Sequence, residues 1–255
     1  MPKQPVVVLK FGGSVLLGEE SLHLAVREIG VWRDSGYRVV AVVSALSGRT
    51  DQLEATCERV APEATGHAKA ALLGIGEAET AALLGLQLLG AGIHAGMLTP
   101  GSARFIARGD PLDADPLGID RAVLEATLDL EGVVVFPGYT AIDELGRPVT
   151  LGRGGSDASA LYIAYALDAA RCRLIKDVDG LYTGDPAKSV PPPARYRVCS
   201  FDDALRTDGS IIQHKAVRLA KRYGVEFELG DLGSTEPTRI ENSSSDVERV
   251  LGSAG

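Results

Sequence analysis

The chain has 255 residues, of which 45% are hydrophobic and 24% charged, and its formal net charge is −8. This composition is typical of a folded globular protein and excludes a disordered or fibrous chain. The acidic balance argues against a general nucleic-acid binder, although a nucleotide pocket needs only local positive charge. The length suffices for one large α/β domain with a substantial core.

The cysteines and the N-terminus indicate a cytoplasmic protein. Cys57, Cys172 and Cys199 are odd in number and match no metal-site spacing, and the four histidines show no paired spacing. No protein metal site is therefore predicted. The apolar run over residues 6–9 is too short for a signal peptide or a membrane span. We expect no membrane and no nucleic-acid partner.

Short apolar strands and helical patterns alternate along the first half of the chain. The runs over residues 6–9 and 39–43 are continuously apolar, which is typical of strands covered on both faces of a sheet. The helical pattern over residues 20–35 should bury Leu22, Val26 and Ile29, with either Val31 or Trp32. Further helices are expected over residues 51–60, 68–90 and 120–130, and further strands within 91–99 and over 133–136.

The second half continues the alternation. A hairpin or long loop is expected over residues 138–148, and the last clear strand over 225–229, followed by a polar, loose tail from 242. Helices are expected over residues 158–170, 200–207 and 211–223, and a strand over 172–176. No linker and no internal repeat divides the chain. The pattern predicts one domain over 1–255, a three-layer αβα sandwich with a mainly parallel central sheet.

The most informative stretch is Leu151-Gly152-Arg153-Gly154-Gly155-Ser156-Asp157, just before a predicted helix. Glycines there let the backbone approach a ligand, and the helix start offers unpaired N–H groups to an anion. Arg153 suits a carboxylate or phosphate, and Ser156 is a hydrogen-bond donor. Asp157 would orient a lysine or help hold Mg²⁺, or it would simply cap the helix from Ala158.

Two further loops carry groups that suit a nucleotide. Lys10-Phe11-Gly12-Gly13-Ser14 ends the first strand and would cradle phosphate, or form only a tight turn; its spacing matches neither a Walker loop nor the dinucleotide fingerprint. The stretch from Lys176 to Pro186 places two carboxylates and Tyr182 after a strand. It would flank a nucleoside, or be an ordinary Asp-Gly turn.

These blocks together resemble the amino-acid kinase superfamily, and within it the catalytic domain of aspartokinases most closely. The resemblance rests on residues 10–15, 43–50, 76–77, 151–157 and 177–186, which occur in the family's order within residues 5–240. It implies an αβα sandwich, ATP with Mg²⁺, transfer of the γ-phosphoryl group to a carboxylate, and a homodimer. It also implies an acid-substrate side over about 1–150 and a nucleotide side over about 151–240.

The resemblance assigns roles to individual residues. Lys10 and Asp157 would be catalytic, with Lys10 neutralising the transferring group and Asp157 organising the site. The acid substrate would be held by Ser44, Thr50, Glu77, Arg153 and Ser156, in which Glu77 suits an ammonium group and Arg153 a carboxylate. The nucleotide would be held by Gly12, Gly13, Ser14, Lys176, Asp177, Tyr182, Asp185, Lys188 and Lys215.

The chain departs from the aspartokinase pattern in its second half. Aspartokinases carry a second lysine before a His-Pro pair, and here that position is Ile211, while Lys215 replaces the proline. Lys176 stands in place of the usual threonine, and Lys188 follows Asp185-Pro186 after an alanine in place of arginine. Lys176, Lys188 or Lys215 would then supply the missing cation. We also expect no regulatory domain within this chain.

Two classes of function follow. The first is an ATP-dependent kinase acting on aspartate or a related amino acid, or on another acid, phosphonate or phosphate. The second is a non-catalytic nucleotide-binding protein with a regulatory or storage role, which the replacement of the second lysine by Ile211 motivates.

Overall fold

The computed structural model describes residues 3–184 and 193–248. Its centre is a nine-stranded sheet with the strand order β13-β10-β12-β11-β9-β1-β2-β6-β3. Only β11 with β12 and β10 with β13 pair antiparallel among these described strands. The strands of this sheet are β1 Val6–Phe11, β2 Arg38–Val43, β3 Gly96–Met97, β6 Val133–Pro137, β9 Arg171–Ile175, β10 Tyr196–Ser200, β11 Phe227–Gly230, β12 Thr238–Glu241 and β13 Asp246–Val247.

Successive residues of the central strands enter two different apolar clusters. In β1, Val6 and Val8 belong to one cluster, whereas Val7 and Leu9 belong to the other. Strands β2 and β6 divide in the same way. Because neighbouring residues of a strand point to opposite faces, the sheet is buried on both sides, which explains its continuously apolar sequence.

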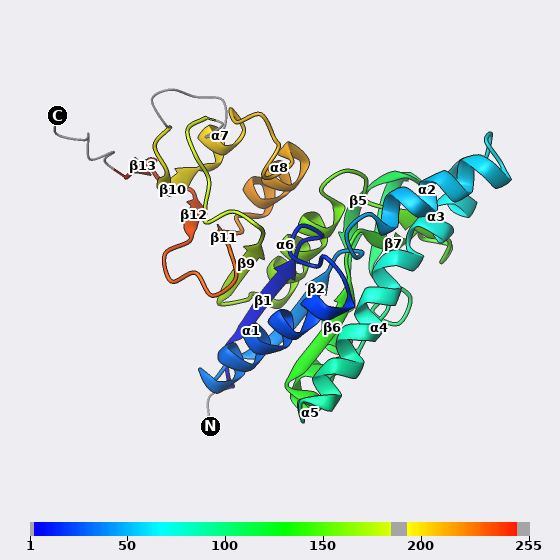
Figure 1. Cartoon of the computed structure of the whole chain (residues 1–255), viewed down its shortest axis with the longest axis horizontal. Coiled ribbons are helices and arrows are strands. Elements are labelled where there is room, and N and C mark those ends of the chain that lie inside the picture. Colours follow the sequence, from blue (N-terminus) through cyan, green and yellow to red (C-terminus); the bar gives the residue numbers. More distant parts are fainter. Residues whose placement is uncertain (1–2, 185–192, 249–255) are drawn as a thin grey trace.

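Helices cover both faces and complete three layers (Figure 1). Helices α1 Leu22–Asp34 and α4 Ile75–Gly90 pack on one face. Helices α5 Arg121–Glu131, α6 Gly155–Leu167 and α8 His214–Tyr223 pack on the other. The remaining helices are η1 Glu19–Ser21, α2 Arg49–Val60, α3 Gly66–Leu73 and α7 Phe201–Ala204. The predicted α/β sandwich with a mainly parallel sheet is confirmed.

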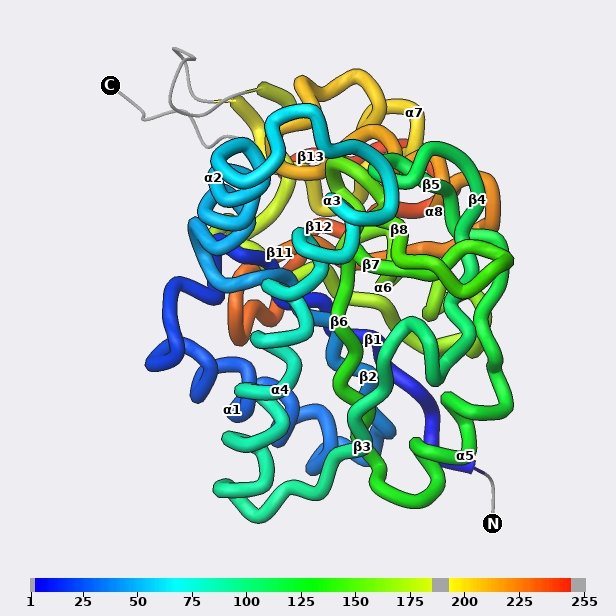
Figure 2. The backbone as a smooth tube through the Cα atoms, turned by 90° about the vertical axis from the view of Figure 1, so that its right-hand side faces the viewer, coloured from blue at the N-terminus to red at the C-terminus, as the bar shows by residue number. Residues whose placement is uncertain are grey.

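A smaller sheet lies beside the carboxyl ends of the central strands, and α3 packs on its strand β8 (Figure 2). Its strand order is β5-β4-β7-β8. The strands are β4 Ile106–Asp110, β5 Asp113–Gly118, β7 Thr140–Ile142 and β8 Pro148–Thr150. The expected hairpin over 138–148 is therefore present as β7 and β8.

Several local expectations need correction. The sequence showed no strand over 106–118 because β4 and β5 are mostly polar and exposed. Strand β11 is not the last one, since β12 pairs with it and β13 pairs with β10. Residues 246–247 are thus not part of a loose tail. In α1, Val26 is only half-buried, whereas Trp32 is the buried one of the two alternatives, Val31 and Trp32.

One apolar stretch, Gly66–Gly90, is long enough at 25 residues to cross a membrane by length and composition alone. It divides at Gly74 into α3 and α4. Ala81, Leu84 and Leu88 of α4 are buried in the sheet core. The core helices of globular proteins meet the same criterion, so the stretch does not by itself indicate a membrane span.

Candidate functional site

A cleft of about 880 Å³ opens at the carboxyl ends of the parallel strands. Lys10 lies near the end of β1, Ser44 follows β2, and Lys176 follows β9. Ligands of α/β proteins commonly bind at this edge, because the loops that follow the strands meet there. The cleft is lined by nine of the predicted residues, namely Lys10, Ser44, Thr50, Glu77, Arg153, Ser156, Asp157, Lys176 and Lys215.

Asp157 lies between two lysines. Its Oδ1 is 2.7 Å from Lys10 Nζ and its Oδ2 is 2.8 Å from Lys176 Nζ. The side chains of Lys10 and Asp157 are 6% and 4% exposed, so this contact is almost completely shielded from water. One carboxylate and two ammonium groups give the cluster a net positive charge at neutral pH, which suits an anionic ligand.

The strands and α6 determine this cluster. Lys10 pairs in register with Leu174 of the neighbouring parallel strand β9. Lys176 is two residues beyond Leu174, so both lysines point to the face that α6 covers. Asp157 lies in the first turn of α6, which begins at Gly155 rather than at Ala158. The interpretation of Asp157 as the cap of a helix from Ala158 is therefore wrong.

Asp157 remains ionised over a wide pH range. Burial alone would raise the pKa of its carboxyl group, but the charges of Lys10 and Lys176 outweigh burial and lower it to about 2. Burial lowers the pKa of Lys10, and the Asp157 carboxylate counteracts that shift. Asp157 thus holds both ammonium groups in place as a permanent counter-ion.

The glycine-rich loop brings the start of α6 close to two other segments. Gly152 has φ +69°, and a Cβ there would lie 2.0 Å from Asp113 Oδ1. Gly154 has φ +75°, and a Cβ there would lie 2.6 Å from Gln213 Cβ. Both positions therefore require glycine on conformation and on space. The start of α6 lines the cleft through Gly155, Ser156 and Asp157.

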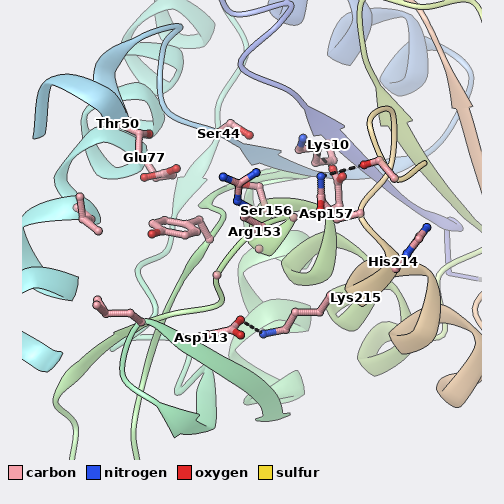
Figure 3. Close-up of a pocket in the computed structure, with 18 of the residues that line it drawn as sticks. Lys10, Ser44, Thr50, Glu77, Asp113, Arg153, Ser156, Asp157, His214 and Lys215 are labelled. Carbon is pink, nitrogen blue, oxygen red and sulfur yellow. Dashed lines mark hydrogen bonds and ion pairs between the residues drawn. The ribbon is translucent and has the colours of Figure 1, made fainter. Parts of the chain in front are cut away.

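Figure 3 shows Thr50 and Glu77 on the other side of the cleft from Lys10 and Asp157. The remaining residues expected to hold an acid, Ser44, Arg153 and Ser156, lie between these two groups in this view. Glu77 is 3% exposed, and its Oε2 has no hydrogen-bond partner among the described residues. Burial raises the pKa of Glu77 to about 7, although backbone N–H groups of Ala45 and Glu77 and the charge of Lys10 lower it. A buried carboxylate with one oxygen free of hydrogen bonds from the described residues, beside a cleft, is suited to receiving a cationic group.

Arg153 is exposed and makes no ion pair within the described part of the chain. Lys69, which is half-buried, and Arg218, which is exposed, also line the cleft and make no ion pair within the described residues. Three cations are thus available to anionic ligands. Sequence reasoning selected Arg153 and passed over Lys69 and Arg218, because neither lies in a recognisable motif.

The three residues of the first glycine loop have different surroundings. Gly12 lies beneath Lys10, where a Cβ would be 3.3 Å from Lys10 Nζ. Gly13 lines a smaller cavity of about 340 Å³ together with Ser44, Thr50 and Glu77. Ser14 is exposed.

A second cavity, of about 650 Å³, adjoins the cleft. It is lined by Asp177 and Tyr182, and it shares Asp208, Ser210 and Ile211 with the cleft. Since Lys176 faces the cleft and Asp177 faces this cavity, the end of β9 lies at the junction between the two. Asp185 and Lys188 lie outside the described residues.

Lys215 lines the cleft but points toward the β4–β5 hairpin (Figure 3). Its Nζ donates to Asp113 Oδ1 at 2.6 Å and to the carbonyl oxygen of Ala114 at 3.0 Å. It also lies 3.3 Å from Asp115 Oδ1. These contacts join the C-terminal half to the hairpin.

Among the described residues, no group of three or more His, Cys, Asp or Glu side chains is arranged to hold a metal ion.

The comparison with known proteins decides the family. A sequence profile described as the amino acid kinase family matches residues 5–228. The chain belongs to the amino acid kinase family. The aspartokinase of Thermus thermophilus is 32% identical over 250 residues, which cover 96% of this chain and 62% of that protein. The chain thus spans about three fifths of that relative's length.

Solved structures agree with this family fold. The aspartate kinase from Synechocystis has a TM-score of 0.80 and 30% identity over 93% of this chain and 40% of its own. Aspartokinase III of E. coli, solved in complex with aspartate and ADP, has a TM-score of 0.76 and 20% identity over 94% of this chain and 65% of its own.

Sequence reasoning missed Tyr139 of this amino acid kinase family member, which lines the cleft with φ +63°. The unusual backbone is held from both sides, since Tyr139 N–H donates to Ser159 Oγ and its carbonyl accepts from Leu151 N–H. A Cβ on Gly155 would lie 2.8 Å from the Tyr139 ring. The only available signal was its position directly after Gly138 at the end of a strand.

Proposed function

We propose that this chain is an ATP-dependent kinase that transfers the γ-phosphoryl group to a carboxylate, with aspartate as the first candidate acceptor. The observation that carries this proposal is the cluster of Lys10, Asp157 and Lys176 at the junction of two cavities. A transfer between two anions requires cations at the reacting centre, and it requires little covalent chemistry from the protein.

The acid would bind in the part of the cleft that the N-terminal half lines. Ser44, Thr50 and Ser156 offer hydroxyl groups. Arg153, which has no ion pair among the described residues, offers a guanidinium for a carboxylate, and Glu77 offers a buried carboxylate for an ammonium group. An acid that also carries an amino group would satisfy both Arg153 and Glu77. Aspartate fits this requirement, and the aspartokinase relatives support it.

The nucleotide would bind on the C-terminal side, about residues 151–240. The nucleoside would occupy the second cavity beside Asp177 and Tyr182, and its phosphates would extend past Lys176 toward Lys10. The loop of Gly12, Gly13 and Ser14 and the start of α6 would supply N–H donors. The described part of the loop does not include Asp185 and Lys188, which we retain as candidates on the nucleotide side.

In the transfer, an oxygen of the acceptor carboxylate attacks the γ-phosphorus and forms a new P–O bond. The bond to the β–γ bridging oxygen breaks, and ADP leaves with the electron pair. Lys10 stabilises the charge that gathers on the transferring group, and Asp157 holds Lys10 in position. No side-chain nucleophile takes part, because the acceptor itself attacks.

Mg²⁺ enters this scheme as part of the MgATP substrate. Nucleotide-bound Mg²⁺ typically keeps several waters and takes phosphate oxygens and one or two carboxylates. Asp157 is the carboxylate at the phosphate end of the cleft, but both of its oxygens already face lysines. ATP and water would therefore supply most of the ligands.

We further propose a cytoplasmic homodimer. The three cysteines are free and buried, which suits a reducing compartment. Helix α4 carries exposed apolar side chains at Ile75, Leu86 and Leu89, which a second copy would cover. Sedimentation equilibrium tests this association, and a monomer at micromolar concentration would contradict it.

The test of the activity is ADP release from ATP against a panel of acids, namely aspartate, glutamate, N-acetylglutamate, a phosphonate and a nucleoside monophosphate. We expect aspartate to give the highest kcat/KM. Turnover on another acid only would reassign the acceptor. Nucleotide binding without turnover on any acid would favour the non-catalytic alternative that Ile211 motivated.

A further inference from the structure

The positive charge at the transfer site comes from more than one lysine. Lys10 and Asp157 form a pair whose net charge is zero, and this pair alone would not offset the charge of an approaching phosphoryl group. Lys176 is the additional cation on the same carboxylate, at 2.8 Å from Asp157 Oδ2. The positive charge of the cluster therefore depends on Lys176.

Lys215 is the other lysine near the cleft, and its geometry suits a different role. Its ammonium faces three oxygens of the β4–β5 hairpin, at Asp113, Ala114 and Asp115, within 3.3 Å. An ammonium group has three N–H bonds, so little donor capacity remains for a ligand. Ile211, on the wall between the two cavities, is apolar and offers no charge.

Lys176, unlike Lys215, retains N–H bonds for a ligand. Asp157 is its one hydrogen-bond partner among the described residues, so two of its N–H bonds remain for a ligand. Its side chain is 15% exposed, compared with 6% for Lys10, which leaves it reachable from the cleft. It also directly precedes Asp177, which lines the second cavity, and it therefore lies where the two cavities meet.

We propose that Lys176 is a second catalytic cation, which binds the γ-phosphoryl group beside Lys10 and stabilises it during transfer. This inference rests on the proposed kinase function. Lys176 keeps its proton throughout: the acceptor oxygen forms the new P–O bond, the bond to the bridging oxygen breaks, and ADP leaves with the electron pair. Lys176 balances the charge on the non-bridging oxygens, while Lys215 only holds the hairpin.

The test compares Lys176→Met, Lys176→Arg and Lys215→Met with the control Lys221→Met, whose lysine lies on α8 and pairs with Asp202. We expect Lys176→Met to lower kcat by about 100-fold or more, as when one preorganised donor is removed from an active site. Its KM for the acid should change little. Lys176→Arg should restore part of kcat, and Lys221→Met should match the wild type.

Binding separates a role in catalysis from a role in folding. Calorimetry gives the ratio of the dissociation constants of ADP and a non-hydrolysable ATP analogue. Lys176→Met should weaken the analogue and leave ADP unchanged, because only the analogue carries a γ-phosphoryl group. The inference is overturned if Lys176→Met keeps both the wild-type kcat and the wild-type ratio of the two dissociation constants. It is also overturned if Lys215→Met, in place of Lys176→Met, lowers kcat and changes that ratio.

A measurement on the wild-type protein covers the case in which Lys176→Met does not fold. An amine-acylating reagent is applied with ADP or with the ATP analogue, and peptide mass spectrometry reports the modification of Lys176. We expect the analogue to protect Lys176 more than ADP does. Equal protection would overturn the inference. If no acid is phosphorylated but this difference remains, the proposed acceptor fails while the assignment of Lys176 to the γ-phosphoryl group stands.

Discussion

Lys10 Nζ lies 2.7 Å from Asp157 Oδ1, and both side chains are almost completely buried. Such a pair contributes little net stability, because the loss of hydration offsets the attraction between the charges. Its position at the carboxyl end of β1 and the start of α6 instead fixes one ammonium group at the edge of the cleft. This arrangement is preorganised for an anionic transition state.

Asp157→Asn should destabilise the fold at neutral pH by about 3 to 5 kcal/mol, because it leaves buried ammonium groups without a counter-charge. The pKa of Asp157 is depressed to about 2, so its stabilising contribution is present above pH 4 and is lost as the pH falls toward 2. Urea unfolding at pH 7, 4 and 2 checks this. A difference between wild type and Asp157→Asn that does not shrink in acid would contradict it.

Glu77→Gln should stabilise the fold at pH 8 and weaken the binding of an amino acid. The pKa of Glu77 is raised to about 7, so the folded state holds its proton more tightly than the unfolded state between pH 4.5 and 7. Stability therefore falls as the pH rises through that window, by about 3 kcal/mol, and the glutamine variant avoids this loss. Urea midpoints of the two proteins should be close at pH 4.5 and diverge at pH 8.

The same carboxyl group predicts a pH dependence of substrate binding. Glu77 must be ionised to attract an ammonium group, so the KM for aspartate in the wild-type protein should rise as the pH falls below about 7. The variant Glu77→Gln should have a higher KM at pH 8 with a flatter profile. A wild-type KM that is constant from pH 8 to pH 6 would contradict the role of Glu77.

Arg153→Ala should raise the KM for the acid by about 10- to 100-fold, which corresponds to the loss of one or two charge-assisted hydrogen bonds. Its stability should be unchanged, because Arg153 is exposed and has no ion pair within the described residues. Steady-state kinetics and thermal unfolding check the two parts. Arg121→Ala, on the exposed side of α5, is the matched control. An unchanged KM would remove Arg153 from the acid site.

Lys215→Met and Asp113→Asn should be weakly coupled. Their ion pair joins α8 to the β4–β5 hairpin at 2.6 Å, but the side chain of Asp113 is 65% exposed. Solvent screening limits the coupling energy to about 1 kcal/mol or less. A double-mutant cycle in urea measures it. A coupling of several kcal/mol would show that Lys215 is more than a surface bridge.

The sequence predicted the core of this fold well because its central strands carry a simple signal. Strands such as β1 and β2 are apolar without alternation, and this pattern has few solutions other than a sheet covered on both faces. Strands β4 and β5 carry mostly polar, exposed residues, and β4 is held by pairing with β5 and with the distant β7. Local patterns do not contain that information.

The candidate site divides in the same way. Lys10, Asp157 and Glu77 were identified from motifs and now line one cleft, although their roles remain proposals. The distinction between Lys176 and Lys215 required their side-chain partners, Asp157 for the first and the β4–β5 hairpin for the second, which no local pattern provides. Tyr139 depends on a backbone conformation that hydrogen bonds from Leu151 and to Ser159 maintain, and that conformation is invisible in the sequence.

The most direct measurement is the trapping of the product. The purified protein is incubated with MgATP, aspartate and hydroxylamine, which converts an acyl phosphate into a hydroxamate that is quantified by mass spectrometry alongside ADP. We predict equal amounts of hydroxamate and ADP for the wild type and a loss of both for Lys10→Met. Release of ADP without hydroxamate for aspartate and every other carboxylate tested would contradict transfer to a carboxyl group.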